Sequence, residues 1–214
     1  TNEEVKRLVD LRPDEFIGFA AVDPHDLEAP DKLEHAFADL DLRGLNLHPG
    51  RQRFYPMDGC VQGLYDICER YNRPVMFHTG MSWEPHTLAK YGRPVEFEEL
   101  AETRPRLRFC LGHFGWPWLE EAAMLMVKHK NVYADTGLLY FDSAREFYAH
   151  LFTRELPSTW IDRSLRHQVM FGSDSPRFEQ IRMARALDGL GLRESTVELI
   201  RGANALDFLN GLEQ

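Results

Sequence analysis

"RFCLGHFGWPW" (residues 108–118) opens with a short apolar run and places a histidine where that run stops. The run is apolar at every position rather than at alternating ones, which predicts a strand buried on both faces. Strands of that kind belong to parallel sheets covered by helices, and such folds bind their ligands at the carboxyl ends of the strands. His113, which follows the run, is therefore a candidate for a ligand-binding site.

The same succession of apolar strand, loop and amphipathic helix repeats along the chain. The predicted strands lie within residues 16–24, 43–50, 73–80, 107–115, 131–137 and 167–176. The predicted helices lie within residues 31–40, 58–72, 93–105, 118–130 and 143–156, and a helix broken at Gly202 ends the chain over residues 195–209. This pattern fits either an open doubly wound sheet or a (β/α)8 barrel.

Polar side chains follow most of the predicted strands at the point where each strand ends. They are Asn46, His48, His78, His113, Asp135 and Asp174. Because side chains alternate along a strand, Phe109, Leu111 and His113 are predicted to share one face, which points into the barrel. The same alternation pairs Met76 with His78.

Each of these polar residues also has an ordinary structural explanation. A histidine that ends a strand is more often a hydrogen-bonded structural residue, and an aspartate after a strand is more often the N-cap of the next helix. Their recurrence at the same end of successive units favours a site. Imidazole and carboxylate groups from His78, His113 and Asp174 suit a divalent metal of the zinc class, whose bound water ionises near neutral pH.

Two further residues close to these strand ends are candidates for substrate contacts. Trp116, in the loop after His113, is predicted to wall a pocket. Arg177, shortly after Asp174, either pairs with a substrate carboxylate or is a solvated residue at the start of a helix, and the sequence favours neither.

The composition of the chain restricts the class of protein. The 214 residues carry a net charge of −9, which argues against a nucleic-acid partner because phosphate binding needs a basic face. The three cysteines fit neither a metal-binding pair nor a disulfide framework, and the sequence shows no membrane-spanning stretch and no signal peptide. We expect a single domain over residues 1–214 in the cytoplasm, with a small-molecule substrate and no nucleic-acid or membrane partner.

A set of short motifs occurs in order along nearly the whole chain. They are "GFAAVDP", "GLNLHPGRQRFYPMD", "PVMFHTG", "KYGRPVEFEELA", "LGHFGWPW", "NVYADTG", "VMFGSDSP" and "RGANALDFL". In these motifs the sequence resembles the amidohydrolase-related (amidohydrolase 2) family of metal-dependent TIM-barrel hydrolases and decarboxylases. The resemblance implies an α/β fold of the (β/α)8 type. The family's first strand carries an HxH pair that this sequence lacks, and "FIGFAAVDP" matches the family's third strand, which implies a partial barrel with strands three to eight.

The resemblance also implies roles for the residues at the strand ends. His78 would be a metal ligand, His113 the general acid/base beside a metal-bound water, and Asp174 a metal ligand that also accepts a proton from that water. Asn46 stands where the carbamylated-lysine variants of the family have a lysine, which implies a single divalent metal. Zinc is the first candidate, and manganese, iron and magnesium are the others. The residues expected to contact substrate are Trp116, His48, Asn46 and Arg177.

These expectations leave three functions open. The first is a metal-dependent hydrolase acting on a small carboxylated or aromatic substrate through a metal-activated water. The second is a non-oxidative decarboxylase that uses the same metal site. The third is a metal-free, inactive barrel remnant with a binding or scaffold role, suggested by the missing HxH pair. Because a partial barrel leaves two strand edges open to pairing, we also expect a homo-oligomer.

Overall fold

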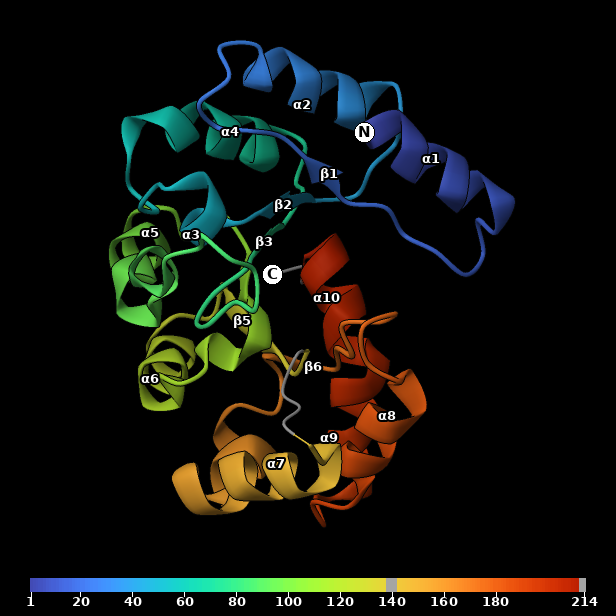
Figure 1. Ribbon diagram of the computed structural model, residues 1–214, viewed down its shortest axis with the longest axis vertical. Coiled ribbons are helices and arrows are strands. Elements are labelled where there is room, and N and C mark those ends of the chain that lie inside the picture. Colours follow the sequence, from blue (N-terminus) through green and yellow to red (C-terminus); the bar gives the residue numbers. More distant parts are fainter. Residues whose placement is uncertain (138–141, 212–214) are drawn as a thin grey trace.

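The computed structural model describes residues 1–137 and 142–211, in which six parallel strands form one sheet (Figure 1). The strands are β1 (Ala20–Ala21), β2 (Leu45–Leu47), β3 (Val75–Phe77), β4 (Phe109–Leu111), β5 (Val132–Asp135) and β6 (Val169–Met170). Each strand pairs with the next along the chain, so β1 and β6 are the edges of the sheet. A doubly wound sheet reverses its strand order, and this one does not. The order confirms the predicted partial barrel of strand–helix units.

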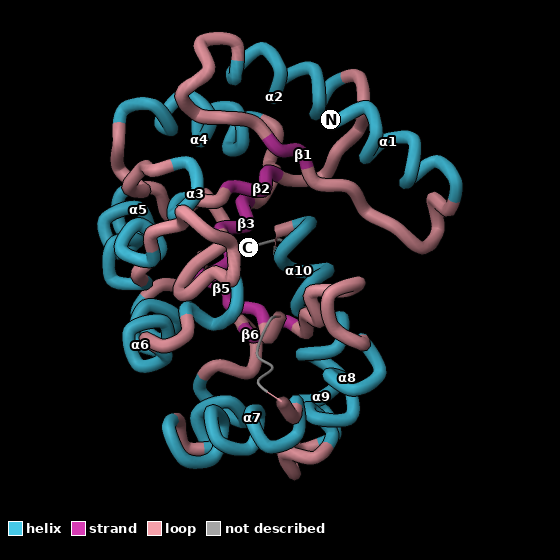
Figure 2. Tube along the Cα trace, in the orientation of Figure 1, coloured by secondary structure: helices cyan, strands magenta, loops and turns pink. Residues whose placement is uncertain are grey.

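Helices connect the strands and cover the sheet. They are α1 (Asn2–Leu11), α2 (Ala29–Ala38), α3 (Pro49–Gln52), α4 (Gly59–Arg70), α5 (Glu98–Thr103), α6 (Leu119–Lys128), α7 (Ala144–His150), α8 (Gln180–Asp188), α9 (Glu194–Glu198) and α10 (Asn204–Asn210). Helices α2, α4, α5 and α6 lie on one side of the sheet, and α10 lies on the opposite side (Figures 1 and 2). Among the described residues, none of these helices combines the length and the apolar character needed to cross a bilayer.

The layer between the sheet and its outer helices is built largely from aromatic rings. Phe77 on β3 and Phe109 on β4 both meet Phe97, which lies in the turn of helix just before α5, with ring centroids 4.9 and 6.0 Å apart. All three side chains are completely or almost completely buried. Their burial holds one face of β3 and β4 against the outer helices. The orientation of these two strands, whose carboxyl ends lead to the histidines, is fixed in this way.

The predicted direction of the β4 side chains was wrong. Phe109 and Leu111 belong to the large core shared with the helices, whereas Cys110 packs on the inner face with Tyr133, Met170 and Phe208. His113 still reaches the inner side, because the chain leaves strand geometry after β4. His113 adopts a left-handed conformation, with φ 59° and ψ 26°, which breaks the alternation that the prediction assumed.

The end of the chain also differs from its prediction. Gly202 does not break a helix. A π-helical turn over Leu199–Ala203 joins α9 to α10 without interruption, and Gly202 lies inside it. The wide turn is compatible with glycine, and it aims α10 at the inner face of the sheet, where Phe208 packs against Tyr133 at a ring-centroid distance of 5.1 Å.

Replacing Phe97 with alanine should lower the free energy of unfolding by about 3–5 kcal/mol, because it removes a fully buried ring from the layer behind β3 and β4. Urea unfolding monitored by circular dichroism measures the change. Phe16→Ala is the matched control, since Phe16 is 54% exposed, and its effect should stay within about 0.5 kcal/mol. Equal losses in the two variants would contradict this description of the core.

Candidate active site at the carboxyl ends of the strands

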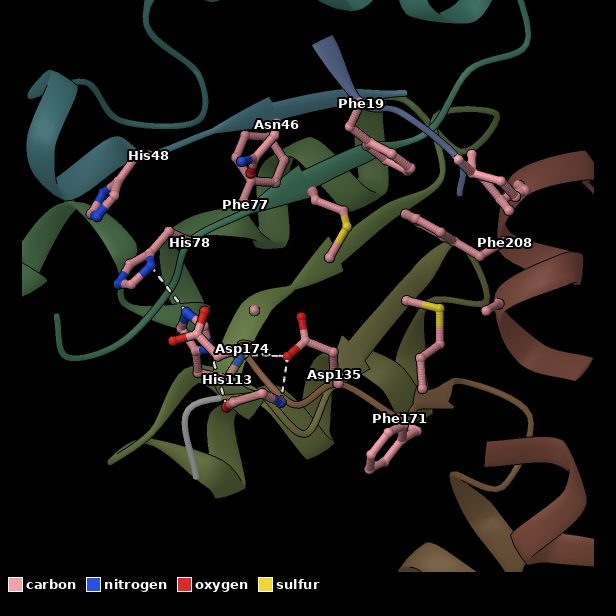
Figure 3. Close-up of a pocket in the computed structure, with 18 residues that line it drawn as sticks. Phe19, Asn46, His48, Phe77, His78, His113, Asp135, Phe171, Asp174 and Phe208 are labelled. Atoms are coloured by element: carbon pink, nitrogen blue, oxygen red, sulfur yellow. Dashed lines mark hydrogen bonds and ion pairs between the residues drawn. The ribbon is translucent and has the colours of Figure 1, made fainter. Parts of the chain in front are cut away.

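A pocket of about 470 Å³ opens at the carboxyl ends of β2 to β6. In Figure 3, the labelled histidines and Asp174 lie along one side of it, and aromatic rings lie along the other. The polar residues that line the pocket are Asn46, His48, His78, His113, Asp135 and Asp174. The apolar lining includes Ile17, Phe19, Met76, Met170, Phe171 and Phe208. The structure therefore brings together side chains from five consecutive strand ends, as the parallel order requires.

A hydrogen-bonded pair of histidines forms the centre of the polar side. His113 Nδ1 lies 3.1 Å from the carbonyl oxygen of Gly137, and His113 Nε2 lies 3.0 Å from His78 Nδ1. A carbonyl oxygen only accepts, so Nδ1 of a neutral His113 carries the proton and Nε2 accepts. His78 Nδ1 must then donate, which leaves an unprotonated Nε2 on His78. That Nε2 is buried and has no hydrogen-bond partner among the described residues.

His78 is held as a neutral imidazole. Burial, together with the neighbouring His113 and His48, lowers its pKa from the ordinary 6.5 to about 2. A neutral imidazole with a free, buried nitrogen lone pair is the form of histidine that binds metals.

His48 lies face to face with His78, with ring centroids 3.9 Å apart and an interplanar angle of 12°. It caps the amino end of α3, where its Nδ1 accepts a hydrogen bond from the amide of Arg51 at 3.2 Å. The proton of a neutral His48 must therefore reside on Nε2, and this atom too is buried without a described partner. Burial lowers the pKa of His48. The stacked rings thus present one unused donor and one unused acceptor.

Asp174 lies after β6 in a left-handed conformation, with φ 57°. The residue is exposed at the rim of the pocket, yet desolvation on the pocket side raises the pKa of its carboxyl group. Its carbonyl oxygen accepts a hydrogen bond from the amide of Arg177 at 3.0 Å, which closes the following turn. A carboxyl group with a raised pKa beside the imidazole of His113 is suited to proton exchange.

Trp116 and Arg177 are placed differently from the other predicted residues. Neither is among the described residues that line the pocket. The indole of Trp116 packs edge-on against Phe147 at 5.8 Å, and the guanidinium of Arg177 lies 5.7 Å from the ring of Trp83. Their roles in substrate binding stay predictions. Asn46, by contrast, lies on the inner face of β2 and lines the pocket as expected.

The loops after β3 and β4 are joined closely, which fixes the two histidines relative to each other. Thr79 donates a hydrogen bond to the carbonyl oxygen of Gly112 at 2.6 Å, and the amide of Met81 donates to that of Trp116 at 2.8 Å. At Gly80, where φ is 71°, a Cβ atom would lie 2.1 Å from the Trp116 carbonyl oxygen. Only glycine fits this contact.

The fit of a divalent metal rests on two of these residues. His78 Nε2 supplies a buried lone pair without a partner, and Asp174 supplies a carboxylate at the rim. No group of three histidine, cysteine or acidic side chains among residues 1–137 and 142–211 is close enough to hold a metal. Catalytic zinc sites use three protein ligands and a water. The described donors therefore match the chemistry of a metal site and form only part of a ligand set.

The sequence places Asp135 at the end of a strand, but it does not reveal what the carboxylate of Asp135 contacts. Its carboxylate accepts hydrogen bonds from the amides of His113 and Gly137, at 3.0 and 2.8 Å. The thiol of Cys110 lies 3.6 Å from the other carboxylate oxygen. Burial and the charge of Asp135 raise the pKa of that thiol, which keeps it protonated. The signal in the sequence was an aspartate at a strand end, in line with the histidines.

Solved structures of low sequence identity share this fold. An uncharacterized TIM-barrel protein from Bordetella bronchiseptica is 22% identical, with a TM-score of 0.81 over 98% of this chain and 72% of that one. The 5-carboxyvanillate decarboxylase of Sphingomonas paucimobilis is 17% identical, with a TM-score of 0.73 over 98% and 71%. A dihydroxybenzoic acid decarboxylase from Polaromonas sp. JS666, solved with manganese and 2-nitroresorcinol, is 16% identical, with a TM-score of 0.71 over 97% and 73%.

Sequence comparison gives the family itself. No curated protein matches the chain. The profile of the amidohydrolase family, in contrast, matches residues 1–211, which include every strand of the sheet and every polar residue of the pocket. The motifs at the strand ends and the partial barrel agree with this match, and the chain belongs to the amidohydrolase (Amidohydro_2) family.

Proposed function

We propose that the protein is a metal-dependent decarboxylase of a small aromatic carboxylic acid. The observation that carries this proposal is the division of the pocket into an apolar wall and a row of histidine and aspartate side chains. The sequence alone favoured hydrolysis, and the apolar wall now favours decarboxylation. Two solved structures with this fold are decarboxylases of aromatic acids by their own descriptions, which agrees with the proposal.

The apolar wall suits an aromatic ring. Phe19, Phe171 and Phe208 line the side of the pocket across from the histidines (Figure 3), and Met170 is also part of the lining. Flat rings gain both burial and ring–ring contacts in such a place.

The polar side supplies the contacts for the carboxylate and the proton. The unused Nε2 donor of His48 is suited to a carboxylate oxygen of the substrate. When the bond between the ring carbon and the carboxylate breaks, its electron pair stays on the ring carbon and must be protonated. His113, whose Nε2 accepts a hydrogen bond from His78 Nδ1, takes up a proton from solvent at that nitrogen as the hydrogen bond breaks, and gives the proton to that carbon. His78 and Asp174 would hold a divalent metal, which supplies positive charge that binds substrate oxygens and acidifies water.

Hydrolysis of a small carboxylated or aromatic substrate is the second candidate. The observation that favours it is Asp174, an exposed carboxyl at the rim with a raised pKa. Such a group accepts a proton from an attacking water that enters from solvent. The same pocket then binds the substrate, and the carbonyl–oxygen or carbonyl–nitrogen bond breaks in place of the carbon–carbon bond.

Incubating the protein with manganese or zinc and a panel of hydroxybenzoic acids in deuterated water should release carbon dioxide and place deuterium on the ring carbon that carried the carboxylate. His113→Gln should slow this reaction at least about 100-fold, because it removes the acid/base group. His86→Gln, an exposed histidine away from the pocket, is the control and should react normally. Cleavage of the matching esters or amides without carbon dioxide would establish the hydrolase instead.

Metal binding should depend on both proposed ligands. Titration with zinc and with manganese, followed by calorimetry and by metal analysis, should show at least about a tenfold loss of affinity in His78→Ala and in Asp174→Ala. His86→Ala should bind as the unmodified protein does. Metal binding that is unchanged in both pocket variants would refute the ligand assignment. Absence of binding in the unmodified protein would favour a metal-free binding or scaffold role.

The stability of the fold should fall in acid because of His78. Its pKa is about 2 in the folded state and near 6.5 when it is unperturbed, so the unfolded state binds the extra proton. The stabilisation is therefore present above about pH 6.5 and is lost as the pH falls towards about 2. Between about pH 7 and pH 5, the unfolding free energy should fall by about 2 kcal/mol more in the unmodified protein than in His78→Gln. Urea unfolding at both pH values measures this difference, and equal pH dependence would contradict a neutral, buried His78.

A further inference from the structure

Asp135 is a buried carboxylate that the proposed reaction does not use. It ends β5 and is 7% exposed. No lysine or arginine among the described residues forms an ion pair with it. Its hydrogen-bond partners are the amides of His113 and Gly137 and the thiol of Cys110, and the imidazole Nδ1 of His113 lies 4.0 Å from its Oδ1. A carboxylate in such a place is retained at a cost, since burial without a cation disfavours the charge. Its contacts point to a role in the histidine pair.

The first contact controls the backbone of His113. Asp135 Oδ1 accepts the His113 amide at 3.0 Å, at a residue whose φ is 59°. Left-handed backbone is unfavourable for histidine, and a charge-assisted hydrogen bond to its amide compensates for this. This turn is also what carries the imidazole from the outer row of β4 to the pocket. Asp135 therefore fixes the backbone position from which the imidazole of His113 extends.

The second contact of Asp135 positions the hydrogen-bond partner of the His113 imidazole. The same Oδ1 atom accepts the amide of Gly137 at 2.8 Å, and the carbonyl oxygen of Gly137 lies 3.1 Å from His113 Nδ1. One carboxylate oxygen thus holds the backbone that bears the imidazole and the peptide that bonds to its Nδ1. Because that carbonyl can only accept, it selects the His113 tautomer with the proton on Nδ1.

We propose that Asp135 is a positioning residue that sets the tautomers of His113 and His78. With its proton on Nδ1, His113 accepts from His78 Nδ1 at 3.0 Å, and the proton of His78 is thereby kept away from Nε2. The proposed function uses two nitrogen atoms, Nε2 of His78 with its free lone pair and the accepting Nε2 of His113. The role inferred for Asp135 therefore rests on the proposed function. Asp135 itself lines the pocket, and its carboxylate acts on the histidines through the two peptide groups that it holds.

Two glycines lie close to the carboxylate of Asp135. A Cβ atom on Gly137 would lie 3.0 Å from Asp135 Oδ1 and 3.5 Å from His113 Nδ1. A Cβ atom on Gly172, at the end of β6, would lie 3.2 Å from the same oxygen and 3.0 Å from the Gly137 amide nitrogen. Glycine at both positions lets the two loops close on the carboxylate, so one oxygen can reach both amides.

Tautomers are read directly from the imidazole nitrogens by NMR of the ¹⁵N-histidine-labelled, metal-free protein at neutral pH. Spectra of His113→Gln and His78→Gln assign the two rings. In the unmodified protein, both rings should be protonated on Nδ1 alone. Asp135→Ala should give mixed tautomers at both rings. Asp135→Asn should restore the single tautomer, because its amide oxygen still accepts from the two backbone amides.

The matched control is Asn131→Ala. Asn131 lies just before β5, at the far end of this strand from Asp135, and its side chain donates to the carbonyl oxygens of Ala101, Arg104 and Leu107. This variant loses a comparable buried hydrogen-bond set and should keep the tautomers of the unmodified protein. Mixed tautomers in Asn131→Ala would mean that general loosening of the fold is responsible, and they would overturn the proposal.

Two other outcomes would also overturn it: a single Nδ1-protonated tautomer that persists in Asp135→Ala, or protonation on Nε2 of His78 in the unmodified protein. If Asp135→Ala does not fold, Gly137→Ala makes the same test, since its Cβ atom would lie 3.0 Å from Asp135 Oδ1 and that oxygen must shift, whereas its 3.5 Å approach to His113 Nδ1 is an ordinary contact. It should give mixed tautomers, and an unchanged spectrum would refute the proposal. All spectra are taken without metal or substrate, so failure of the proposed reaction leaves this result intact, and the reverse also holds.

Discussion

The turn that follows β4 decides what the pocket can do. Without it, the alternation of a strand would send His113 to the same side as Phe109 and Leu111, into the helix layer. The left-handed conformation at His113, held by the carboxylate of Asp135, brings the imidazole to within 3.0 Å of His78. The histidine pair, and with it the tautomer that leaves the lone pair of His78 free, depends on that one change of direction.

The sheet supplies the frame for this turn. Strictly sequential parallel pairing puts five successive strand ends side by side, which is why residues far apart in the sequence share one pocket. Aromatic packing behind β3 and β4 fixes the outer faces of those strands, so their polar ends have a defined direction. The apolar inner face, which includes Met170 and Phe208, then becomes the wall opposite the histidines. Fold and site therefore share the same elements.

The sequence was sufficient for the fold and for most of the pocket. Uniformly apolar strands predicted a parallel sheet, and polar residues at their ends predicted the positions of His78, His113 and Asp174, because both features follow from local pattern. The side-chain direction in β4 could not be predicted, since it depends on a left-handed turn stabilised by a residue on the next strand. Gly202 was misjudged for a related reason, because packing of α10 on the sheet favours a wide helical turn over a break.

The contacts of Asp135 lay beyond any local pattern. An aspartate at a strand end is equally suited to capping a helix, to binding a metal or to accepting backbone amides, and only the arrangement of neighbouring loops decides among these. The incomplete set of metal ligands could not be predicted from local patterns either. His78 and Asp174 can each be recognised at a strand end, but a metal site requires side chains from several strands to lie close together.

We propose that His78 Nε2 and Asp174 bind one metal beside an aromatic acid. Crystals grown with manganese and a hydroxybenzoate test it most directly, through anomalous diffraction at the manganese edge. We expect a single strong peak, bonded to His78 Nε2 and the Asp174 carboxylate, with the aromatic ring against Phe171 and Phe208. A pocket that holds no metal while His78 Nε2 bonds to the protein itself would contradict it.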